Sequence, residues 1–214
     1  MITRFICLAN SFKEGGRCVA GVELDEQNTP VFEKRKPKWI RPVCNTPHGE
    51  IPTEMAAPFK LLDIIELEVT EKQPQGHQSE NVAFDEKSIR ICGSFNPEGL
   101  LAICDKVPLI FGNVEKAVSP DEIEDLNHSL LLLHLDSFEV VSKQFEGKRD
   151  RPQIRLNFSY LGNQYGFPIT DPSFLHRYKV RPGLIKNKNQ IFVCLSLGIF
   201  WKDGFYKLVA GIIY

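Results

Sequence analysis

Short stretches in which apolar and polar residues alternate recur along this chain, and turn-forming residues separate them. The clearest is 154–160 (IRLNFSY), which alternates without interruption. Side chains on a strand point to the two faces of a sheet in turn, so this pattern is typical of a half-buried strand. About ten such stretches occur with few and short helical segments, which favours small barrels or a sandwich over a parallel α/β fold.

The expected strands fall into two groups, one at each end of the chain. They cover 2–9, 17–24, 39–43 and 61–70, and then 130–142 (two strands with a bend near Asp136), 154–160, 165–169, 190–197 and 205–213. The first two strands form a hairpin whose loop we expect to be long, because Asn10, Ser11 and the pair Gly15-Gly16 interrupt the pattern. Pro42 predicts an edge position for the third strand, since proline cannot donate to a ladder.

The middle of the chain predicts short helices. Residues 97–105 bunch apolar residues without alternation, which suits a short helix. The run SPDE at 119–122 has a serine cap followed by proline and two acids, and Asp171-Pro172 starts a further helix by the same logic. A small strand is expected at 109–113.

These segments together predict a mainly β protein with minor α content. The strand-rich parts 1–90 and 129–214 each have the size of a compact five-stranded barrel. We expect residues 91–128 to be a short helical connector between them.

Composition excludes some classes of function. The chain has 214 residues, of which 43% are hydrophobic and 25% charged, as in ordinary globular proteins. A formal net charge of −1 argues against a protein that binds nucleic acid over its whole surface, but it allows a local basic stripe. The sequence has no long apolar run and no signal-peptide cleavage site after its N-terminal residues, so we expect no membrane contact and a cytoplasmic location.

The six cysteines are widely spread, and none forms a CxxC pair. Most lie inside apolar runs, which favours buried free thiols over a zinc site. We therefore expect no metal and no cofactor.

Several motifs occur in a characteristic order along nearly the whole chain: CLANSFKEGGRCVAG, WIRPV, HQSEN, FSYLGNQYGFPITDP, CLSLG and YKLVAGII. Together they resemble the dual OB-containing domain family of prokaryotes. The resemblance implies two OB-like five-stranded barrels in tandem, and a role in recognising nucleic acid or a nucleotide. Asn10 and Ser11, in the first motif, are also among the expected ligand-binding residues.

Arg17 is a candidate ligand-binding residue because it follows Gly15-Gly16, where the backbone can approach a ligand closely. Its guanidinium could form a forked contact with a phosphate. The alternative is an ion pair with Glu14 or Glu23 on a solvated hairpin.

Trp39 and Arg41 are expected to share one face of a strand, because they are two residues apart. An exposed aromatic ring beside an arginine forms a stacking platform for a base. The alternative is a core tryptophan with Arg41 in an ion pair. The basic residues from Lys34 to Lys38 add positive charge beside them.

The loop 73–81 contains the densest polar cluster, formed by His77, Gln78, Glu80 and Asn81. A histidine near a glutamate could act in acid–base chemistry, and a loop of this kind could also hydrogen-bond base edges. A polar surface loop is the third interpretation. No nucleophile or metal partner lies at a fixed spacing, so we assign no catalytic residue.

Three functions remain open from the sequence. The first is a non-enzymatic binding module for single-stranded nucleic acid or a nucleotide. The second is an enzyme that acts on a nucleotide or another small phosphorylated substrate through the His77–Asn81 loop and Arg17. The third is an adaptor whose partner is another protein.

Overall fold

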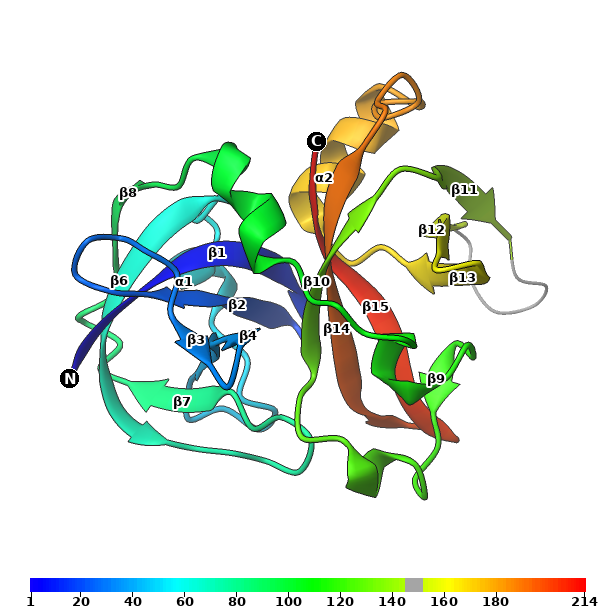
Figure 1. The fold of residues 1–214 in the computed structure, drawn as a ribbon. Coiled ribbons are helices and arrows are strands. Elements are labelled where there is room, and N and C mark those ends of the chain that lie inside the picture. Colours follow the sequence, from blue (N-terminus) through cyan, green and yellow to red (C-terminus); the bar gives the residue numbers. More distant parts are fainter. Residues whose placement is uncertain (145–151) are drawn as a thin grey trace.

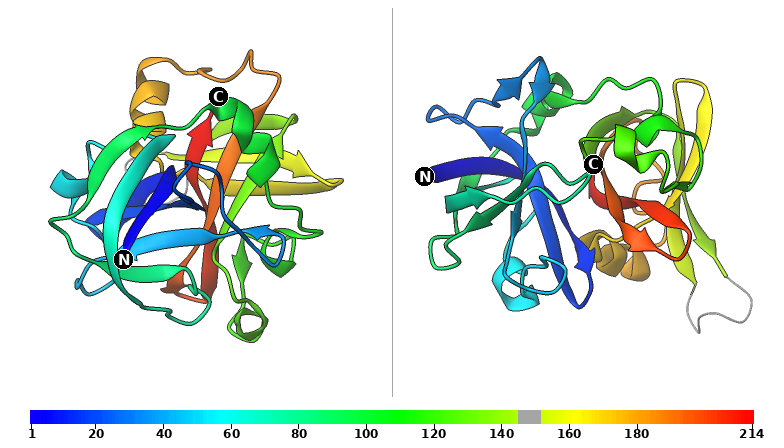
Figure 2. Two further views of the ribbon diagram at one scale, coloured as in Figure 1. Left: turned by 60° about the vertical axis from the view of Figure 1, so that its left-hand side comes forward. Right: turned by 90° about the horizontal axis from the view of Figure 1, so that it is seen from below.

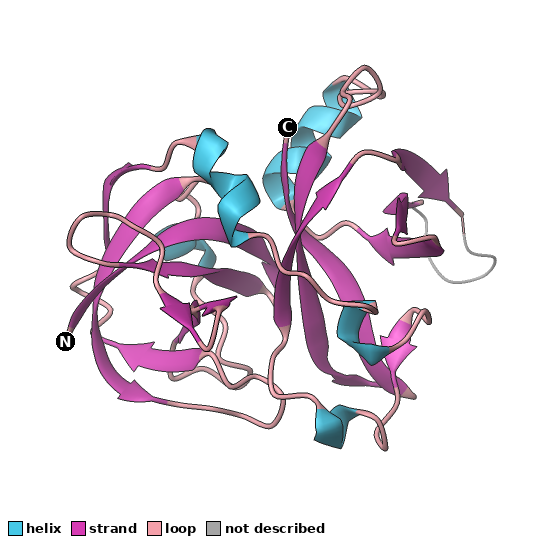
Figure 3. Cartoon of the chain, viewed as in Figure 1, coloured by secondary structure: helices cyan, strands magenta, loops and turns pink. Residues whose placement is uncertain are grey.

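The structure is a computed structural model in which residues 1–144 and 152–214 are described. Two β-rich lobes lie side by side, with the first half of the chain in one and the second half in the other (Figures 1 and 3). The right-hand view in Figure 2 shows the same separation from below. In the described part of the chain, no helix has the length and apolar content that a membrane crossing needs.

The first lobe is a closed barrel of five strands. These are β1 (Ile2–Lys13), β2 (Gly16–Leu24), β5 (Trp39–Val43), β6 (Asp63–Lys72) and β7 (Asn81–Phe84). They pair in the order β1-β2-β5-β7-β6, and β1 also pairs with β6, which closes the barrel. The pair β5–β7 is parallel and the other pairs are antiparallel. A further strand, β8 (Arg90–Ser94), adds to β6 at the edge.

The second lobe is a half-barrel made of two sheets. One sheet has the order β10 (Leu130–Leu135), β14 (Ile191–Trp201), β15 (Gly204–Ile213) and β9 (Ala117–Val118). The other has the order β11 (Phe138–Lys143), β12 (Gln153–Tyr160) and β13 (Asn163–Pro168). A single parallel bridge between Ile169 and Val209 links them. The expectation of two complete barrels is therefore confirmed for the first lobe and only in part for the second.

The remaining elements are short. They are β3 (Phe32–Glu33), β4 (Lys36–Pro37), α1 (Thr53–Ala56), α2 (Pro172–Val180) and the 3₁₀ helices η1 (Pro97–Ile103), η2 (Ile110–Gly112) and η3 (Ile123–Asp125). The segment 91–128 thus combines 3₁₀ turns with β9 and most of β8, so it contributes strands to both lobes. The barrel and connector boundaries expected from the sequence remain a prediction.

Helix-cap patterns located two of the short helices. Asp171 accepts a hydrogen bond from the Phe174 amide at the start of α2 (3.0 Å). Ser119 and Glu122 exchange hydrogen bonds, although only one 3₁₀ turn follows them. The strand expected at 109–113 is wrong, because Phe111 has a φ of 49° and Gly112 a φ of 83°, and the chain turns there as η2.

The first hairpin also differs from expectation. Asn10 and Ser11 lie within β1, opposite Val19 and Cys18. The loop has only two residues, Glu14 and Gly15, with φ values of 42° and 87°, which suits the tight turn of a twisted hairpin. The expected long loop is wrong, because Asn10 and Ser11 are short polar residues that pair within a strand and do not form a turn.

Pro42 does not mark an edge strand, because β5 lies between β2 and β7. The ladder from β5 to β2 involves Trp39 and Ile40, and the ladder to β7 begins at Arg41. The proline therefore lies beyond the end of the β2 ladder, where its missing N–H leaves no partner unsatisfied.

A shared apolar core joins the two lobes. It contains Leu8 and Ala20 from the first barrel, and Leu132, Cys194 and Ala210 from the second lobe. A Cβ added to Gly211 would lie 2.2 Å from the carbonyl oxygen of Leu8, so the two backbones approach more closely than any other residue at 211 would permit. Burial of this kind fixes the position of one lobe against the other.

Most of the cysteines fit the buried-thiol interpretation. Four are buried: Cys7, Cys18, Cys44 and Cys194. Cys104 is half-buried and Cys92 is exposed, and all six are free thiols. Burial raises the pKa of the Cys44 thiol to about 12, so that thiol is not a ready nucleophile.

Candidate functional site

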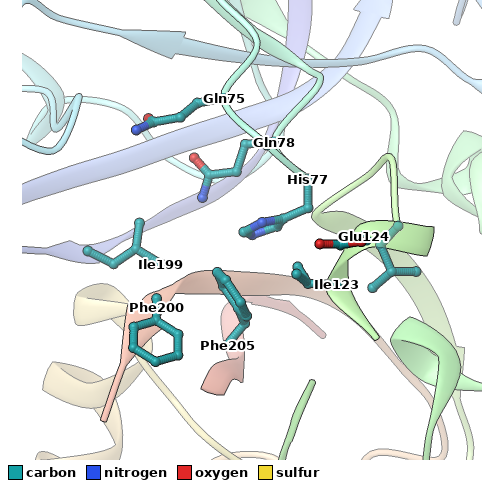
Figure 4. A pocket seen from close by; sticks show the side chains of 10 residues that line it. Gln75, His77, Gln78, Ile123, Glu124, Ile199, Phe200 and Phe205 are labelled. Carbon is teal, nitrogen blue, oxygen red and sulfur yellow. The ribbon is translucent and has the colours of Figure 1, made fainter. Parts of the chain in front are cut away.

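A pocket of about 600 Å³ opens where three distant segments meet (Figure 4). One segment is the loop after β6, one surrounds η3, and one is the end of the β14–β15 hairpin. Its lining residues are Gln75, Gly76, His77, Gln78, Ile123, Glu124, Leu126, Ile199, Phe200 and Phe205. The pocket therefore exists only because the two lobes are packed together.

A tight turn directs His77 into this pocket. Gln75 and Gln78 exchange backbone hydrogen bonds of 3.1 and 3.0 Å, and Gly76 between them has a φ of 53°, which favours glycine. The turn leaves His77 only 7% exposed, with its ring edge-on to Phe205 at 4.9 Å between centroids.

The chemistry of His77 follows from its burial. Burial lowers the pKa of the imidazole, the Arg41 charge lowers it further, and Glu80 partly opposes the effect. The ring is therefore neutral at neutral pH. Its Nε2 atom is buried and has no hydrogen-bond partner.

Gln78 lies beside His77 and is also buried. Its Oε1 accepts a hydrogen bond from Asn81 Nδ2 at 3.3 Å, which fixes the amide. Figure 4 shows the amide nitrogen turned toward His77 and Ile199. A donor and a possible acceptor therefore lie next to each other on one wall of the pocket.

Behind this wall lies a buried polar cluster that we call the seam network: Arg41, Glu80, Asn81, Ser129 and Ser196. Arg41 is 1% exposed, and its NH2 lies 3.2 Å from Glu80 Oε1. The same NH2 donates to Ser196 Oγ at 3.4 Å, and Ser129 Oγ donates to Glu80. Both serines belong to the second lobe, so the network ties the lobes together.

The seam network limits what His77 can do as an acid or base. The Glu80 carboxylate, which the sequence offered as its partner, is engaged by Arg41 and Ser129. A glutamate held in this way is not positioned to orient the imidazole.

Next to the pocket, the β14–β15 hairpin carries four aromatic residues that we call the aromatic tip: Phe200, Trp201, Phe205 and Tyr206. Phe200 is 52% exposed and Trp201 is 53% exposed. The ring centroids of Phe200 and Phe205 are 5.5 Å apart, and those of Trp201 and Tyr206 are 5.4 Å apart. Successive residues of a strand face opposite ways, so each face of the hairpin presents one aromatic pair.

Cations accompany the outer pair of the aromatic tip. Lys202 Nζ lies 4.1 Å from the centre of the Trp201 ring, and Lys116 Nζ lies 5.6 Å from that of Tyr206. The side of the hairpin that faces the pocket differs from this outer side in charge, because the pocket lining includes Glu124 and has neither lysine nor arginine.

The nine residues expected to bind a ligand do not meet in one cleft. His77 and Gln78 line the pocket, whereas Arg41, Glu80 and Asn81 form the seam network behind it. His77, Gln78, Glu80 and Asn81 are buried, whereas residues 73–76 and Ser79 are exposed, so the polar surface loop describes only part of 73–81. The surroundings of Arg41 match the alternative in which it forms an ion pair, here with Glu80.

The other four candidates lie away from the pocket lining. Asn10 Nδ2 donates to the carbonyl oxygens of Ala56 (2.8 Å) and Phe59 (2.9 Å). Ser11 is buried in β1, and Trp39 packs against the core between the lobes.

Arg17 lies 4.6 Å from the centre of the Phe12 ring. Burial lowers the pKa of its guanidinium. The structure thus gives it an aromatic neighbour in place of the expected acidic ones.

Sequence reasoning missed the aromatic tip. The signal was present in IFWKDGFY (199–206), where aromatic residues flank a turn on both sides. Only the turn was predicted there, because aromatic residues on a strand are more often part of a core. Their exposure depends on where the hairpin ends relative to the lobe.

Comparisons with known proteins come from three sources. No curated protein matched the chain. Among solved structures, one similar chain comes from "Structure and Conformational Change of a Replication Protein A Heterotrimer Bound to ssDNA". It is 13% identical, with a TM-score of 0.35, over 98% of this chain and 46% of that one. This protein therefore spans about half of that chain, and a likeness of this size carries no argument about function.

The family comparison is more informative. A family model described as the dual OB-containing domain matches residues 3–212, which is nearly the whole chain. It agrees with the closed five-stranded barrel and the half-barrel described above, and it confirms the resemblance drawn from the motifs. The chain belongs to the dual OB-containing domain family.

Proposed function

We propose that this protein is a non-enzymatic binding module for single-stranded nucleic acid or a nucleotide, and that the aromatic tip is its contact surface. The observation that carries the proposal is the exposure of Phe200 and Trp201, each more than half accessible at the end of the β14–β15 hairpin. Stacking of a base on an aromatic side chain contributes about 1–3 kcal/mol and tolerates any base.

The position of the hairpin supports the proposal. OB-folds bind their ligands through one sheet face and through the loops between strands one and two and between strands four and five. The β14–β15 loop joins the last two strands of the second lobe. Because the chain belongs to the dual OB-containing domain family, the β14–β15 loop corresponds in position to the OB-fold loop between strands four and five.

The charge around the hairpin fits a weak electrostatic contribution to the binding of nucleic acid. Lys202 and Lys116 lie beside the outer aromatic pair, while the whole chain has a net charge of −1. Binding should therefore depend on stacking at the tip, with a few phosphate contacts added. The cytoplasmic location expected from the sequence remains a prediction.

Fluorescence polarisation with a labelled single strand of about 12 nucleotides tests the proposal. We expect Trp201→Ala to weaken binding roughly 5- to 150-fold, the equivalent of one lost stacking contact. Phe32→Ala is the matched control, since Phe32 is also an exposed aromatic (49%) but belongs to the first lobe. Equal affinities for the parent and Trp201→Ala would overturn the proposal, as would a tip that binds another protein and no oligonucleotide.

A further inference from the structure

We infer that the pocket beneath the aromatic tip holds one uncharged nucleobase by a hydrogen-bonding edge and excludes phosphate. The inference deepens the proposed function and rests on it. It assigns the pocket a ligand class, a nitrogen heterocycle with a donor next to an acceptor, and it separates that site from the outer stacking surface.

The size and walls of the pocket suit a base. A volume of about 600 Å³ lies within the range of roughly 300–1,000 Å³ typical of small-molecule sites. Ile199, Phe200 and Phe205 form an apolar and aromatic wall from the hairpin, and Ile123 adds to it from the segment around η3 (Figure 4). Leu126 of the same segment also lines the pocket. Flat heterocycles bury well against such walls.

His77 is the observation that points to a ligand. The residue is only 7% exposed, and it lines the pocket. Its Nε2 atom has no hydrogen-bond partner. A buried polar atom without a hydrogen bond costs stability, so such atoms are normally satisfied. A ligand in the pocket would satisfy this one.

The neutral ring makes Nε2 an acceptor. The backbone of Gly198 and Leu197 raises the pKa of His77, as carbonyls that accept from a ring N–H do. A neutral imidazole carries its proton on one nitrogen and a lone pair on the other, so Nε2 accepts from a donor on the ligand in the tautomer that has the proton on Nδ1. The adjacent Gln78 amide nitrogen offers a donor, so the wall matches the acceptor–donor edge that every nucleobase has.

Phosphate is disfavoured in the same space. Glu124 is the one charged residue among those lining the pocket. A phosphate placed near it would meet like-charge repulsion with no arginine or lysine in the lining to offset it. The sugar–phosphate part of a ligand must therefore point out of the pocket.

Titration of the full-length protein, labelled with ¹⁵N-histidine, against adenosine and then against its 5′-monophosphate tests the inference by NMR. Adenosine should move the His77 Nε2 resonance, and the monophosphate should bind about fivefold more weakly, the effect of one nearby like charge. His77→Phe should abolish adenosine binding. His134→Phe is the matched control, because the His134 ring also lies against a phenylalanine (Phe192, 5.1 Å) but away from the pocket lining.

A second variant keeps the test decisive if His77→Phe folds poorly. Glu124 is exposed, so Glu124→Gln should fold normally, and it should remove the difference in affinity between adenosine and the monophosphate. Tighter binding of the monophosphate to the parent protein, or a shift caused by inorganic phosphate alone, would overturn the inference.

Oligonucleotide binding to the same variants separates the two proposals. If Trp201→Ala weakens oligonucleotide binding while adenosine never binds, the proposed function stands and the pocket assignment fails. If adenosine binds through His77 but no oligonucleotide binds, the pocket assignment stands and the nucleic-acid function fails.

Discussion

The seam network contains a cation and the aromatic tip lies beside one, but the two cations have opposite surroundings. In the seam network, the cation Arg41 is 1% exposed and is paired with Glu80 at 3.2 Å. At the tip, Trp201 is 53% exposed and lies beside the cation Lys202. The seam network joins segments that are far apart in sequence, whereas the aromatic tip belongs to one hairpin and leaves its groups accessible.

The comparison shows that residue type alone does not identify a binding surface. A buried guanidinium that is already paired contributes to the docking of two lobes. An exposed ring beside a lysine is free to stack on a base. The predictions below test this division of roles.

The largest effect should come from Arg41→Met. This change leaves the buried Glu80 carboxylate without its cation, which typically costs about 3–5 kcal/mol of unfolding free energy. Urea denaturation measures it. Lys38→Met is the control, because Lys38 makes an ion pair of the same kind with Glu23 (2.9 Å) at a partly exposed position, where about 0–1 kcal/mol is expected.

If Arg41→Met lowers the free energy of unfolding as little as Lys38→Met does, the structural role given to the seam network is contradicted. That result would return Arg41 to the list of ligand-binding candidates.

The second effect concerns Lys207, which anchors the root of the tip on β15. Its Nζ donates to the carbonyl oxygens of Ile110 (2.6 Å) and Asn113 (2.8 Å), and it has no side-chain exposure. Burial lowers the pKa of Lys207 from 10.5 to about 8.

The unfolded chain therefore binds more protons than the folded one between pH 8 and 10.5. The stability that Lys207 contributes is complete above pH 10.5 and is lost as pH falls through about 8. Relative to Lys207→Met, the parent should gain on the order of 3 kcal/mol across this interval, measured by urea denaturation at a series of pH values. Parallel pH curves for the two proteins would show that this cation is compensated as Arg41 is.

The smallest effect should appear in the salt dependence of binding. Removing one phosphate contact by Lys202→Ala should reduce the slope of log affinity against log salt by about 0.7 for a single strand. Lys34→Ala, in the basic run of the first lobe, should leave the slope unchanged. If Lys34 changes the slope and Lys202 does not, the contact surface lies on the first lobe, as the basic run first suggested.

Much of the architecture could be predicted because it is local. Alternation located strands such as β12, and the bend near Asp136 separates β10 from β11 as expected. Cap residues such as Asp171 placed the start of α2. These signals depend on neighbouring residues and survive in a single sequence.

The site was harder to predict because it depends on the docking of the lobes. His77 and Gln78 are polar, so their composition predicts an exposed loop, yet packing against β14 and β15 buries them. Phe200 and Trp201 are apolar, so their composition predicts a core, yet the hairpin projects beyond the lobe. At His77, contact with Phe205, more than 100 residues away in sequence, overrides the local preference.

The fluorescence of Trp201 gives the most direct test of the central claim. The chain has two tryptophans, so Trp39→Phe leaves Trp201 as the sole indole, while Phe keeps an aromatic ring in the core between the lobes. Titration with an unlabelled single strand should quench this emission in step with binding, and added salt should weaken the effect. Binding of the oligonucleotide with no change in Trp201 emission would show that the aromatic tip is not the contact surface.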